Sequence, residues 1–369
     1  MTGHPEDERL MRLALALGYR NLGRTWPNPS VGAVLVDPDD GRIVAVGMTQ
    51  SGGRPHAERI ALTEAGGAAR GKTLYVSLEP CSHHGRTPPC AEAVIASGVS
   101  RVVTSLEDAD GRVAGRGHAM IQEAGIALKT GVLAAEAASD HRGHFTRVRE
   151  GRPAVTLKLA QTADGFAAAE QQGRLLITGE GANARTHMLR AHADAVLVGV
   201  STVLADDPRL DVRLPGLQER SPVRIVLDSR LRTPPQSRLV KTAGERQTII
   251  LCGRGAHPDA ERALSDHGAR IIRTSCDDQG RIELTSALRR LGDTGLTRVL
   301  CEVGPTLADA LARDDLVDEA VVITNERPLG RPGLVAIGPH LAEALRSRLI
   351  PLSVEQVGPD RIQVFERAP

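Results

Sequence analysis

Apolar residues recur along the first part of the chain in two different patterns. From Glu6 to Leu22 the apolar residues are three or four positions apart, as on one face of a helix. From Gly32 to Gly47, two apolar runs flank the sequence Asp-Pro-Asp-Asp-Gly, which is typical of a strand, a turn and a second strand. The chain is therefore predicted to begin with a helix followed by a β-hairpin.

Further along, helical and strand patterns alternate. Helices are predicted from about residue 57, over 88–97 and over 117–124, and strands over 73–78, 101–105 and 126–131. Such alternation is typical of an α/β domain in which helices cover a sheet.

The polar stretch 139–153 interrupts this alternation, and we place a domain boundary there. The first domain is predicted to span residues 1–146 and the second 152–369. The second contains another α/β series, with strands predicted over 154–159, 195–200, 223–228, 248–252, 298–303 and 319–323. Because no internal repeat is evident, the second domain is expected to differ in fold from the first.

Size and charge limit the kinds of function. A chain of 369 residues is long enough for about two globular units. Its 46 Lys and Arg balance 45 Asp and Glu, so no general attraction to nucleic acid or to an anionic membrane is expected. Aromatic residues make up only 2%, too few for base-stacking platforms.

No apolar run reaches the roughly 18 residues of a membrane span, and the acidic first ten residues lack a signal-peptide core. We therefore expect a cytoplasmic protein with no membrane partner. Five cysteines are too few for a disulfide framework. Cys252, Cys276 and Cys301 are expected to be ordinary buried thiols.

The remaining two cysteines belong to a constellation that suits zinc. His56, Cys81 and Cys90 offer one imidazole and two thiolates, and three protein ligands leave the fourth tetrahedral position for water. Glu58 is the candidate for carrying protons beside that water. His56 and Glu58 are two residues apart, and residues with this spacing do not share a face of a regular helix. Both can reach one metal site only if His56 lies at the very start of the helix, and Pro55 before it is compatible with that.

This His-x-Glu, Pro-Cys and Cys arrangement is the signature of zinc-dependent deaminases. The usual signature has two residues between the cysteines, whereas eight intervene here. An alternative is a closed structural zinc site with His83 or His84 as the fourth ligand. Such a site would have no need of Glu58.

Several longer segments resemble the bifunctional deaminase/reductase family of bacterial riboflavin biosynthesis. In the first domain these are residues 27–32 (Pro-Asn-Pro-Ser-Val-Gly), His56-Ala57-Glu58, 78–90 and 113–117. In the second domain they are 157–160, 164–165, 201–208 and 304–307. The resemblance covers nearly the whole chain.

The resemblance implies an N-terminal cytidine-deaminase-like α/β/α domain followed by a dihydrofolate-reductase-like α/β domain. The implied cofactors are Zn²⁺ and NADPH. The implied substrate is a phosphorylated pyrimidine, 2,5-diamino-6-ribosylamino-4(3H)-pyrimidinone 5-phosphate, which is deaminated on the ring and then reduced from ribosyl to ribityl. A homo-oligomer, dimer or tetramer, built through the reductase half is also implied.

The resemblance also implies site residues. Substrate contacts are expected in the deaminase half from Asn28, His83 and Arg86, and in the reductase half from Arg190, Leu210, Arg213 and Glu302. Cofactor contacts are expected from Lys158, Gln161, Leu176, Thr202, Asp206, Ser229, Gly304, Pro305 and Thr306. Asn28 could equally cap the backbone of its Pro-Asn-Pro turn. The strand-Gly-helix junction around Gly304 offers backbone N–H groups to a cofactor phosphate.

Two departures from the family pattern keep other functions open. Leu176 stands where the family commonly has Trp, and Arg174 where a small hydroxyl residue is usual. One alternative is a deaminase whose C-terminal half is a non-catalytic ligand-binding or regulatory module, which would release ammonia without oxidising NADPH. Another is a nucleic-acid-editing deaminase, which the neutral charge disfavours and which would bind RNA in a salt-dependent manner.

Overall fold

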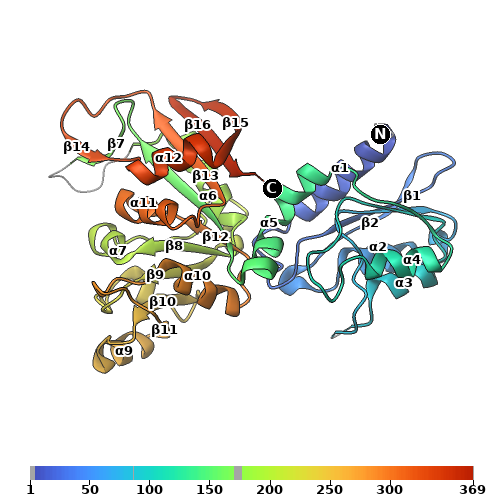
Figure 1. Ribbon diagram of the computed structural model, residues 1–369, viewed down its shortest axis with the longest axis horizontal. Helices are drawn as coiled ribbons and strands as arrows, with labels where there is room; N and C mark the ends of the chain where they lie inside the picture. The colour runs from blue at the N-terminus through green and yellow to red at the C-terminus, as the bar shows by residue number, and fades with distance from the viewer. Residues whose placement is uncertain (1–4, 86, 170–176, 369) are drawn as a thin grey trace. The chain divides into compact units, whose positions relative to one another are not determined.

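The computed structural model describes residues 5–85, 87–169 and 177–368. The chain forms two compact units, Met1–Glu150 and Gly151–Ala368, which are coloured blue to green and green to red in Figure 1. Within the described residues, no helix is both long enough and apolar enough to cross a membrane.

The first unit contains a five-stranded sheet in the order β2-β1-β3-β4-β5. β1 pairs antiparallel with β2 and β3, whereas β3, β4 and β5 are parallel. Its strands are β1 Gly32–Val36, β2 Ile43–Met48, β3 Thr73–Val76, β4 Arg101–Thr104 and β5 Ala127–Lys129. Its helices are α1 Pro5–Tyr19, α2 Ala57–Ala65, α3 Cys90–Ser97, α4 Arg116–Glu123 and α5 Ala134–Glu150.

Alternate side chains of β1 enter two different cores, because successive residues of a strand point to opposite faces. Ala33 and Leu35 join the core that includes residues of α2, α3 and α4. Val34 and Val36 join the core that includes residues of α1 and α5. Helices thus cover both faces of the sheet, and the predicted α/β/α domain is confirmed.

α5 occupies part of the polar stretch that was expected to separate the domains. Several of its buried positions are polar or glycine, among them His141, Gly143 and Thr146, while Phe145 is also buried. Because the buried face is not uniformly apolar, the sequence lacked the hydrophobic period by which a helix is usually recognised. The polar stretch therefore begins within a helix rather than in a linker.

The second unit contains a nine-stranded sheet in the order β11-β10-β9-β8-β12-β6-β13-β16-β15. The seven strands from β11 to β13 are parallel, and β16 and β15 complete one edge in antiparallel fashion. β7 and β14 form a separate two-stranded sheet.

The bounds of the elements in the second unit are as follows. The strands are β6 Ala154–Gln161, β7 Phe166–Ala169, β8 Ala195–Gly199, β9 Val223–Leu227, β10 Thr248–Gly253, β11 Arg270–Thr274, β12 Arg298–Cys301, β13 Glu319–Asn325, β14 Gly333–Val335, β15 Leu349–Val357 and β16 Asp360–Arg367. The helices are α6 Glu180–Ala191, α7 Val200–Asp206, α8 Arg238–Lys241, α9 Pro258–Ser265, α10 Leu284–Asp293, α11 Pro305–Arg313 and α12 Pro339–Ser347.

The strand order changes direction at β8. β9, β10 and β11 follow it on one side, while β12 and β6 lie on the other. In open α/β sheets, ligands bind outside the carboxyl ends of the strands at such a switch point. Gly199 ends β8 and Gly304 follows β12, so the segments after these two strands are where a ligand is expected.

Candidate functional site

His56 and Glu58 lie at the start of α2. His56 is the residue before the first helical turn and has an extended backbone (φ −72°, ψ 157°). Glu58 lies in the first turn and is only 3% exposed. His56 therefore lies at the start of its helix, as predicted from its spacing of two residues from Glu58.

Cys81 and Cys90 bring their sulfur atoms to the imidazole of His56. His56 Nδ1 lies 3.3 Å from Cys90 Sγ and 3.7 Å from Cys81 Sγ. Zn–N bonds of about 2.0–2.1 Å and Zn–S bonds of about 2.3 Å in a tetrahedron place N and S about 3.6 Å apart. All three donor atoms lie within 4.8 Å of one another, so these residues fit a zinc ion.

The charges in this cluster are those of a site built for a cation. A hydrogen bond from the Cys90 thiol lowers the pKa of Cys81 to about 4, against the effect of burial and with help from His56. Because the Cys90 thiol donates that hydrogen bond to Cys81, and because it is buried, the pKa of Cys90 is raised. A metal cation favours the thiolate form of both cysteines. Burial raises the pKa of Glu58, as suits a carboxyl group that takes up and returns a proton.

Asn28 and the long loop between the cysteines surround this cluster. Asn28 Nδ2 donates to the carbonyl oxygen of Gly53 (2.8 Å) and lies 3.5 Å from Nε2 of His56. Nδ1 of His83 is buried and has no hydrogen-bond partner among the described residues. His84 is exposed and lies 3.5 Å from Glu92. Neither loop histidine belongs to the cluster of donor atoms in the described part of the chain, which disfavours a closed structural site.

Glu79, which the sequence analysis did not single out, lies two residues before Cys81. Its Oε2 accepts hydrogen bonds from the backbone N–H groups of Asp108 (3.1 Å) and Gly115 (3.0 Å). Its Oε1 accepts from those of Gly117 (2.8 Å) and His118 (3.2 Å). One buried carboxylate thus ties the segment before α4 to the segment that carries a metal ligand.

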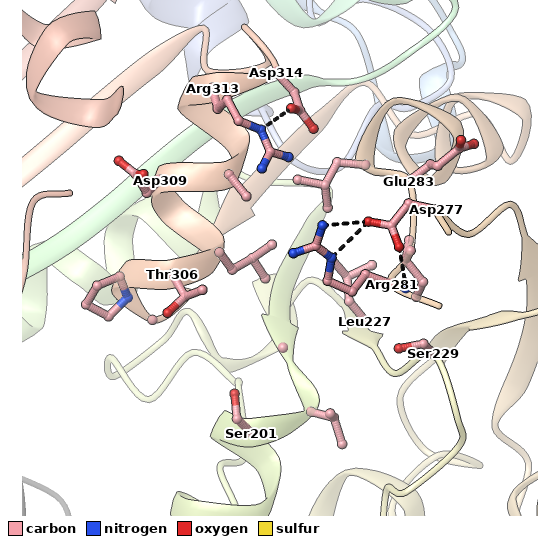
Figure 2. A pocket seen from close by; sticks show the side chains of 18 of the residues that line it. Ser201, Leu227, Ser229, Asp277, Arg281, Glu283, Thr306, Asp309, Arg313 and Asp314 are labelled. Carbon is pink, nitrogen blue, oxygen red and sulfur yellow. Dashed lines mark hydrogen bonds and ion pairs between the residues drawn. The ribbon is translucent and has the colours of Figure 1, made fainter. Parts of the chain in front are cut away.

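The second unit has a cavity of about 1330 Å³ at the switch point between β8 and β12. Figure 2 shows Ser201, Ser229 and Thr306 around it, with Arg281 directed at Asp277. The predicted cofactor residues Ser229, Gly304, Pro305 and Thr306 line this cavity. Thr202 and Asp206 belong to α7, which begins with two lining residues, Val200 and Ser201.

Around Glu302, just beyond β12, lie two further predicted site residues, Arg190 for the substrate and Lys158 for the cofactor. Arg190 of α6 binds the carboxylate in bidentate fashion, with Nε–Oε1 and Nη2–Oε2 distances of 2.6 and 2.8 Å. Burial tends to raise the pKa of Glu302, but the Arg190 guanidinium and the Lys158 ammonium outweigh it and lower that pKa. Burial in turn lowers the pKa of Lys158. These three groups form one charged cluster.

The remaining predicted residues of the reductase half have various surroundings. Leu210 is 3% exposed, has a positive φ of 53° and packs in the core of the unit. Arg213 is half-exposed and donates to Asp211 Oδ1 (2.5 Å). Gln161 donates to Thr324 Oγ1 on the neighbouring strand (3.0 Å). Arg86 and Leu176, like Arg174, lie outside the described residues.

Other residues of the cavity belonged to no recognised motif. Asp277 and Arg281 line it from a turn after β11, and Arg232 from the loop after β9. The only local signal for that turn is the run Asp-Asp-Gln-Gly-Arg at 277–281, which is rich in turn-forming residues.

Both halves of the chain match known protein families. Residues 153–362 match the family model of the RibD C-terminal domain, and residues 4–106 match that of the cytidine and deoxycytidylate deaminase zinc-binding region. The chain is 39% identical to riboflavin biosynthesis protein RibD of Escherichia coli, over 96% of this chain and 98% of that protein. It is 38% identical to the RibD protein of Mycobacterium tuberculosis H37Rv, over 96% and 95%.

Solved structures show the same similarity. The RibD structure of Acinetobacter baumannii, form 1, matches with a TM-score of 0.85 and 32% identity over 99% of each chain. The diaminohydroxyphosphoribosylaminopyrimidine deaminase/5-amino-6-(5-phosphoribosylamino)uracil reductase of Thermotoga maritima matches with a TM-score of 0.83 and 30% identity, over 98% of this chain and 99% of that one. The expected pair of folds, one cytidine-deaminase-like and one dihydrofolate-reductase-like, is confirmed.

Proposed function

Because the chain belongs to the RibD family of bifunctional deaminase/reductases of riboflavin biosynthesis, we propose that the residues described above carry both activities in this protein. The deaminase domain is assigned to residues 1–146 and the NADPH-dependent reductase domain to 152–369. The observation that carries the deaminase assignment is the spacing of the His56, Cys81 and Cys90 donor atoms, with buried Glu58 beside them.

In the deaminase half, His56, Cys81 and Cys90 hold zinc. A zinc ion held there would lower the pKa of a water molecule, which could then attack the ring carbon that carries the amino group. Glu58 carries the proton from the nucleophile to the departing ammonia. Asn28, beside the imidazole of His56, contacts the pyrimidine, and His83 and Arg86 contact the substrate from the loop.

In the reductase half, the cavity between β8 and β12 holds NADPH, which supplies hydride. Ser229, Gly304, Pro305 and Thr306 line the cavity and bind the cofactor. Lys158, Gln161, Leu176, Thr202 and Asp206 complete its site. Arg190, Leu210, Arg213 and Glu302 form the substrate pocket, and the half-exposed guanidinium of Arg213 suits the substrate phosphate.

The protein binds its phosphorylated pyrimidine substrate and does not bind nucleic acid, in keeping with a net charge of only +1. The cytoplasm is the proposed location, because none of the five cysteines forms a disulfide and reduced cysteines persist in a reducing compartment.

The proposed homo-oligomer, a dimer or tetramer, is supported by the edge strand β15. Ile350, Leu352 and Val354 on this strand are 49%, 55% and 58% exposed. A strand at a sheet edge that exposes apolar side chains is open to pairing with another chain. Light scattering should therefore give a mass that is a multiple of 39.2 kDa, and Val354→Lys should lower it. A monomeric wild-type protein would contradict the proposal.

The two activities are tested together by mass spectrometry of the products formed from the diaminopyrimidinone ribosylamino phosphate. Zinc-loaded protein should give the deaminated product alone without NADPH, and a product with two further hydrogens when NADPH is added. Deamination that is unaffected by NADPH would contradict the reductase assignment. A lack of deamination by zinc-loaded protein would contradict the role of Glu58.

A further inference from the structure

The residues just before His56 form a tight turn that packs against the metal-binding cluster. The backbone N–H of Gly53 donates to the carbonyl oxygen of Gln50 (2.9 Å). The carbonyl oxygen of Gly53 accepts from Asn28 Nδ2, and a Cβ atom on Gly53 would lie only 2.8 Å from that nitrogen. The turn therefore fixes the backbone of Arg54, which stands two residues before a metal ligand.

The side chain of Arg54 extends from this turn to the loop between the two cysteines. Its Nη1 donates to Thr87 Oγ1 (2.6 Å). Its Nη2 would lie 3.4 Å from a Cβ atom on Gly85. In the sequence, Gly85 stands between His83 and Arg86, the two loop residues proposed to contact the substrate. The guanidinium of Arg54 therefore lies against the same stretch of loop.

The charge of Arg54 is not matched by a carboxylate among the described residues. Two other arginines of the same unit are paired, Arg101 with Asp7 and Arg112 with Asp110. The partner of Arg54 is a neutral hydroxyl, and within the described part of the chain only Nη1 has a hydrogen-bond partner. The edge of the planar guanidinium formed by Nε and Nη2 therefore remains for an anion.

We propose that Arg54 binds the 5-phosphate of the substrate during deamination and so selects the phosphorylated substrate over its dephosphorylated counterpart. This inference rests on the proposed deaminase function of the first unit. The departing amino group is on the ring, whereas the phosphate is at the far end of the ribose. The partner of the phosphate must therefore lie away from the metal, as the extended side chain of Arg54 does. A phosphomonoester carries nearly two negative charges, and a guanidinium binds its oxygens in bidentate fashion.

The loop between the cysteines is also held by contacts that do not involve Arg54. Arg59 Nη2 donates to the carbonyl oxygen of Pro88 (3.0 Å). The backbone N–H of Ala91 donates to the carbonyl oxygen of Cys81 (3.1 Å), which joins the two ends of the loop. Arg54→Ala should therefore remove a positive charge without releasing the loop.

The test compares ammonia release by the zinc-loaded full-length protein from the phosphorylated substrate and from the same compound after phosphatase treatment. Arg54→Ala should lower kcat/KM for the phosphorylated substrate about 10- to 100-fold, mainly through KM, the effect of losing a hydrogen bond between charged groups. For the dephosphorylated compound, kcat/KM should change less than about threefold. In calorimetry, the variant should bind ribose 5-phosphate more weakly by about the same factor as the loss in kcat/KM.

Three further variants separate the charge of Arg54 from its contact with the loop. Arg54→Lys keeps the charge but not the fork of N–H groups, so its loss should be intermediate. Thr87→Val removes the hydroxyl that Arg54 contacts but keeps the guanidinium, and it should have a smaller effect of the same kind. Arg112→Ala is the matched control, because it removes a cation that is already paired with Asp110, and it should change neither kcat/KM nor ribose 5-phosphate binding.

Two results would overturn the inference while leaving the deaminase function intact. One is an Arg54→Ala variant that lowers kcat/KM for both compounds by the same factor, with Thr87→Val reproducing the loss, since Arg54 would then only position the loop. The other is an Arg54→Ala variant that affects the phosphorylated substrate no more than Arg112→Ala does. Zinc-loaded wild-type protein that releases no ammonia would instead overturn the proposed function, and this inference with it.

Discussion

Glu58 is the residue whose position says most about the first reaction. It is 3% exposed at the start of a helix, two residues from His56, yet it is not one of the three donor groups that fit zinc. Its carboxyl group is therefore free to move protons rather than to hold the metal. A buried carboxyl group with a raised pKa is suited to general acid–base catalysis.

Glu58→Gln keeps the shape of the side chain and removes its ability to take up a proton. Ammonia release should fall at least about 100-fold, the usual contribution of general acid–base catalysis. Zinc content, measured by elemental mass spectrometry, should stay at the wild-type level, and the Kd of NADPH should not change. Loss of zinc together with activity would mean that Glu58 acts on the metal site itself.

Asp7 is a second buried carboxylate, with a structural role. Its side chain is 4% exposed and accepts hydrogen bonds from Arg101 (2.9 and 2.8 Å), Lys129 (2.7 Å) and Tyr75 (2.8 Å). Burial alone would raise the pKa of Asp7, but these three donors together lower it. The group therefore stabilises the folded state in its ionised form.

The pH dependence of this stabilisation follows from the lowered pKa. Since the folded pKa lies below the unfolded value of about 3.9, the contribution is full above that value and is lost as pH falls toward the folded pKa. Asp7→Asn should cost about 2 kcal/mol at pH 7, and the difference from wild type should shrink below about pH 4. The single tryptophan, Trp26, lies in this unit, so its fluorescence in urea measures the effect. A difference that does not change with pH would contradict the assignment.

At the scale of elements, Glu79 joins the segment before Cys81 to the start of α4. Each of its oxygens accepts two backbone N–H groups. The contact is close, because a Cβ atom on Gly117 would lie 2.0 Å from the carbonyl oxygen of Pro80. The position of a metal ligand thus depends on a loop that begins more than 20 residues further along the chain.

Glu79→Gln leaves one accepting oxygen and places an amide group against two buried N–H donors. The deaminase unit should lose about 2–4 kcal/mol of stability, measured by urea unfolding with Trp26 fluorescence. Amide hydrogen exchange at Asp108, Gly115, Gly117 and His118 should accelerate. Glu107→Gln is the control, since Glu107 is exposed, and it should change neither quantity. Unchanged exchange in Glu79→Gln would show that the loop is held by other contacts.

The elements that could be predicted from the sequence include strands such as β9 and β10, which are buried along their length. β15 was missed because eight of its nine residues are not buried and Pro351 interrupts it. α5 was missed because its buried face includes His141 and Thr146. A hydrophobic pattern reports burial, and these elements bury few apolar side chains.

The same distinction applies to the candidate sites. The zinc ligands could be recognised because His56, Cys81 and Cys90 fall in short motifs whose chemistry needs those residue types. Arg232 and Arg281 could not, because they belong to separate loops whose meeting depends on strand order.

At the scale of the whole molecule, the described residues of each candidate site belong to one unit. The donor atoms and Glu58 all come from residues before Glu150, and the large cavity is lined by residues of the second unit. Each unit has its own hydrophobic cores. Changes at one site are therefore expected to leave the binding and chemistry of the other unaffected.

This independence predicts complementation between two inactive variants. Glu58→Gln lacks the deaminase activity, and Glu302→Gln, which breaks the bidentate pair with Arg190, should lack the reductase activity. Mixed with substrate and NADPH, the two full-length proteins should form the reduced product, because the deaminated intermediate passes through solution from one to the other. In this mixture the Glu58→Gln protein acts as the reductase. The lag before the reduced product appears, measured by mass spectrometry, should shorten as the concentration of the Glu58→Gln protein is raised.

The controls are each variant alone, which should give only unreacted substrate or only deaminated product. The Glu58→Gln protein supplied directly with the deaminated intermediate should reduce it at the wild-type rate, since its second unit is unaltered. If that protein reduces the added intermediate but the mixture forms no final product at any concentration, the intermediate does not leave the enzyme that makes it. The deaminated intermediate would then stay on one molecule while both sites act on it. The two units would fold independently but would depend on each other during turnover.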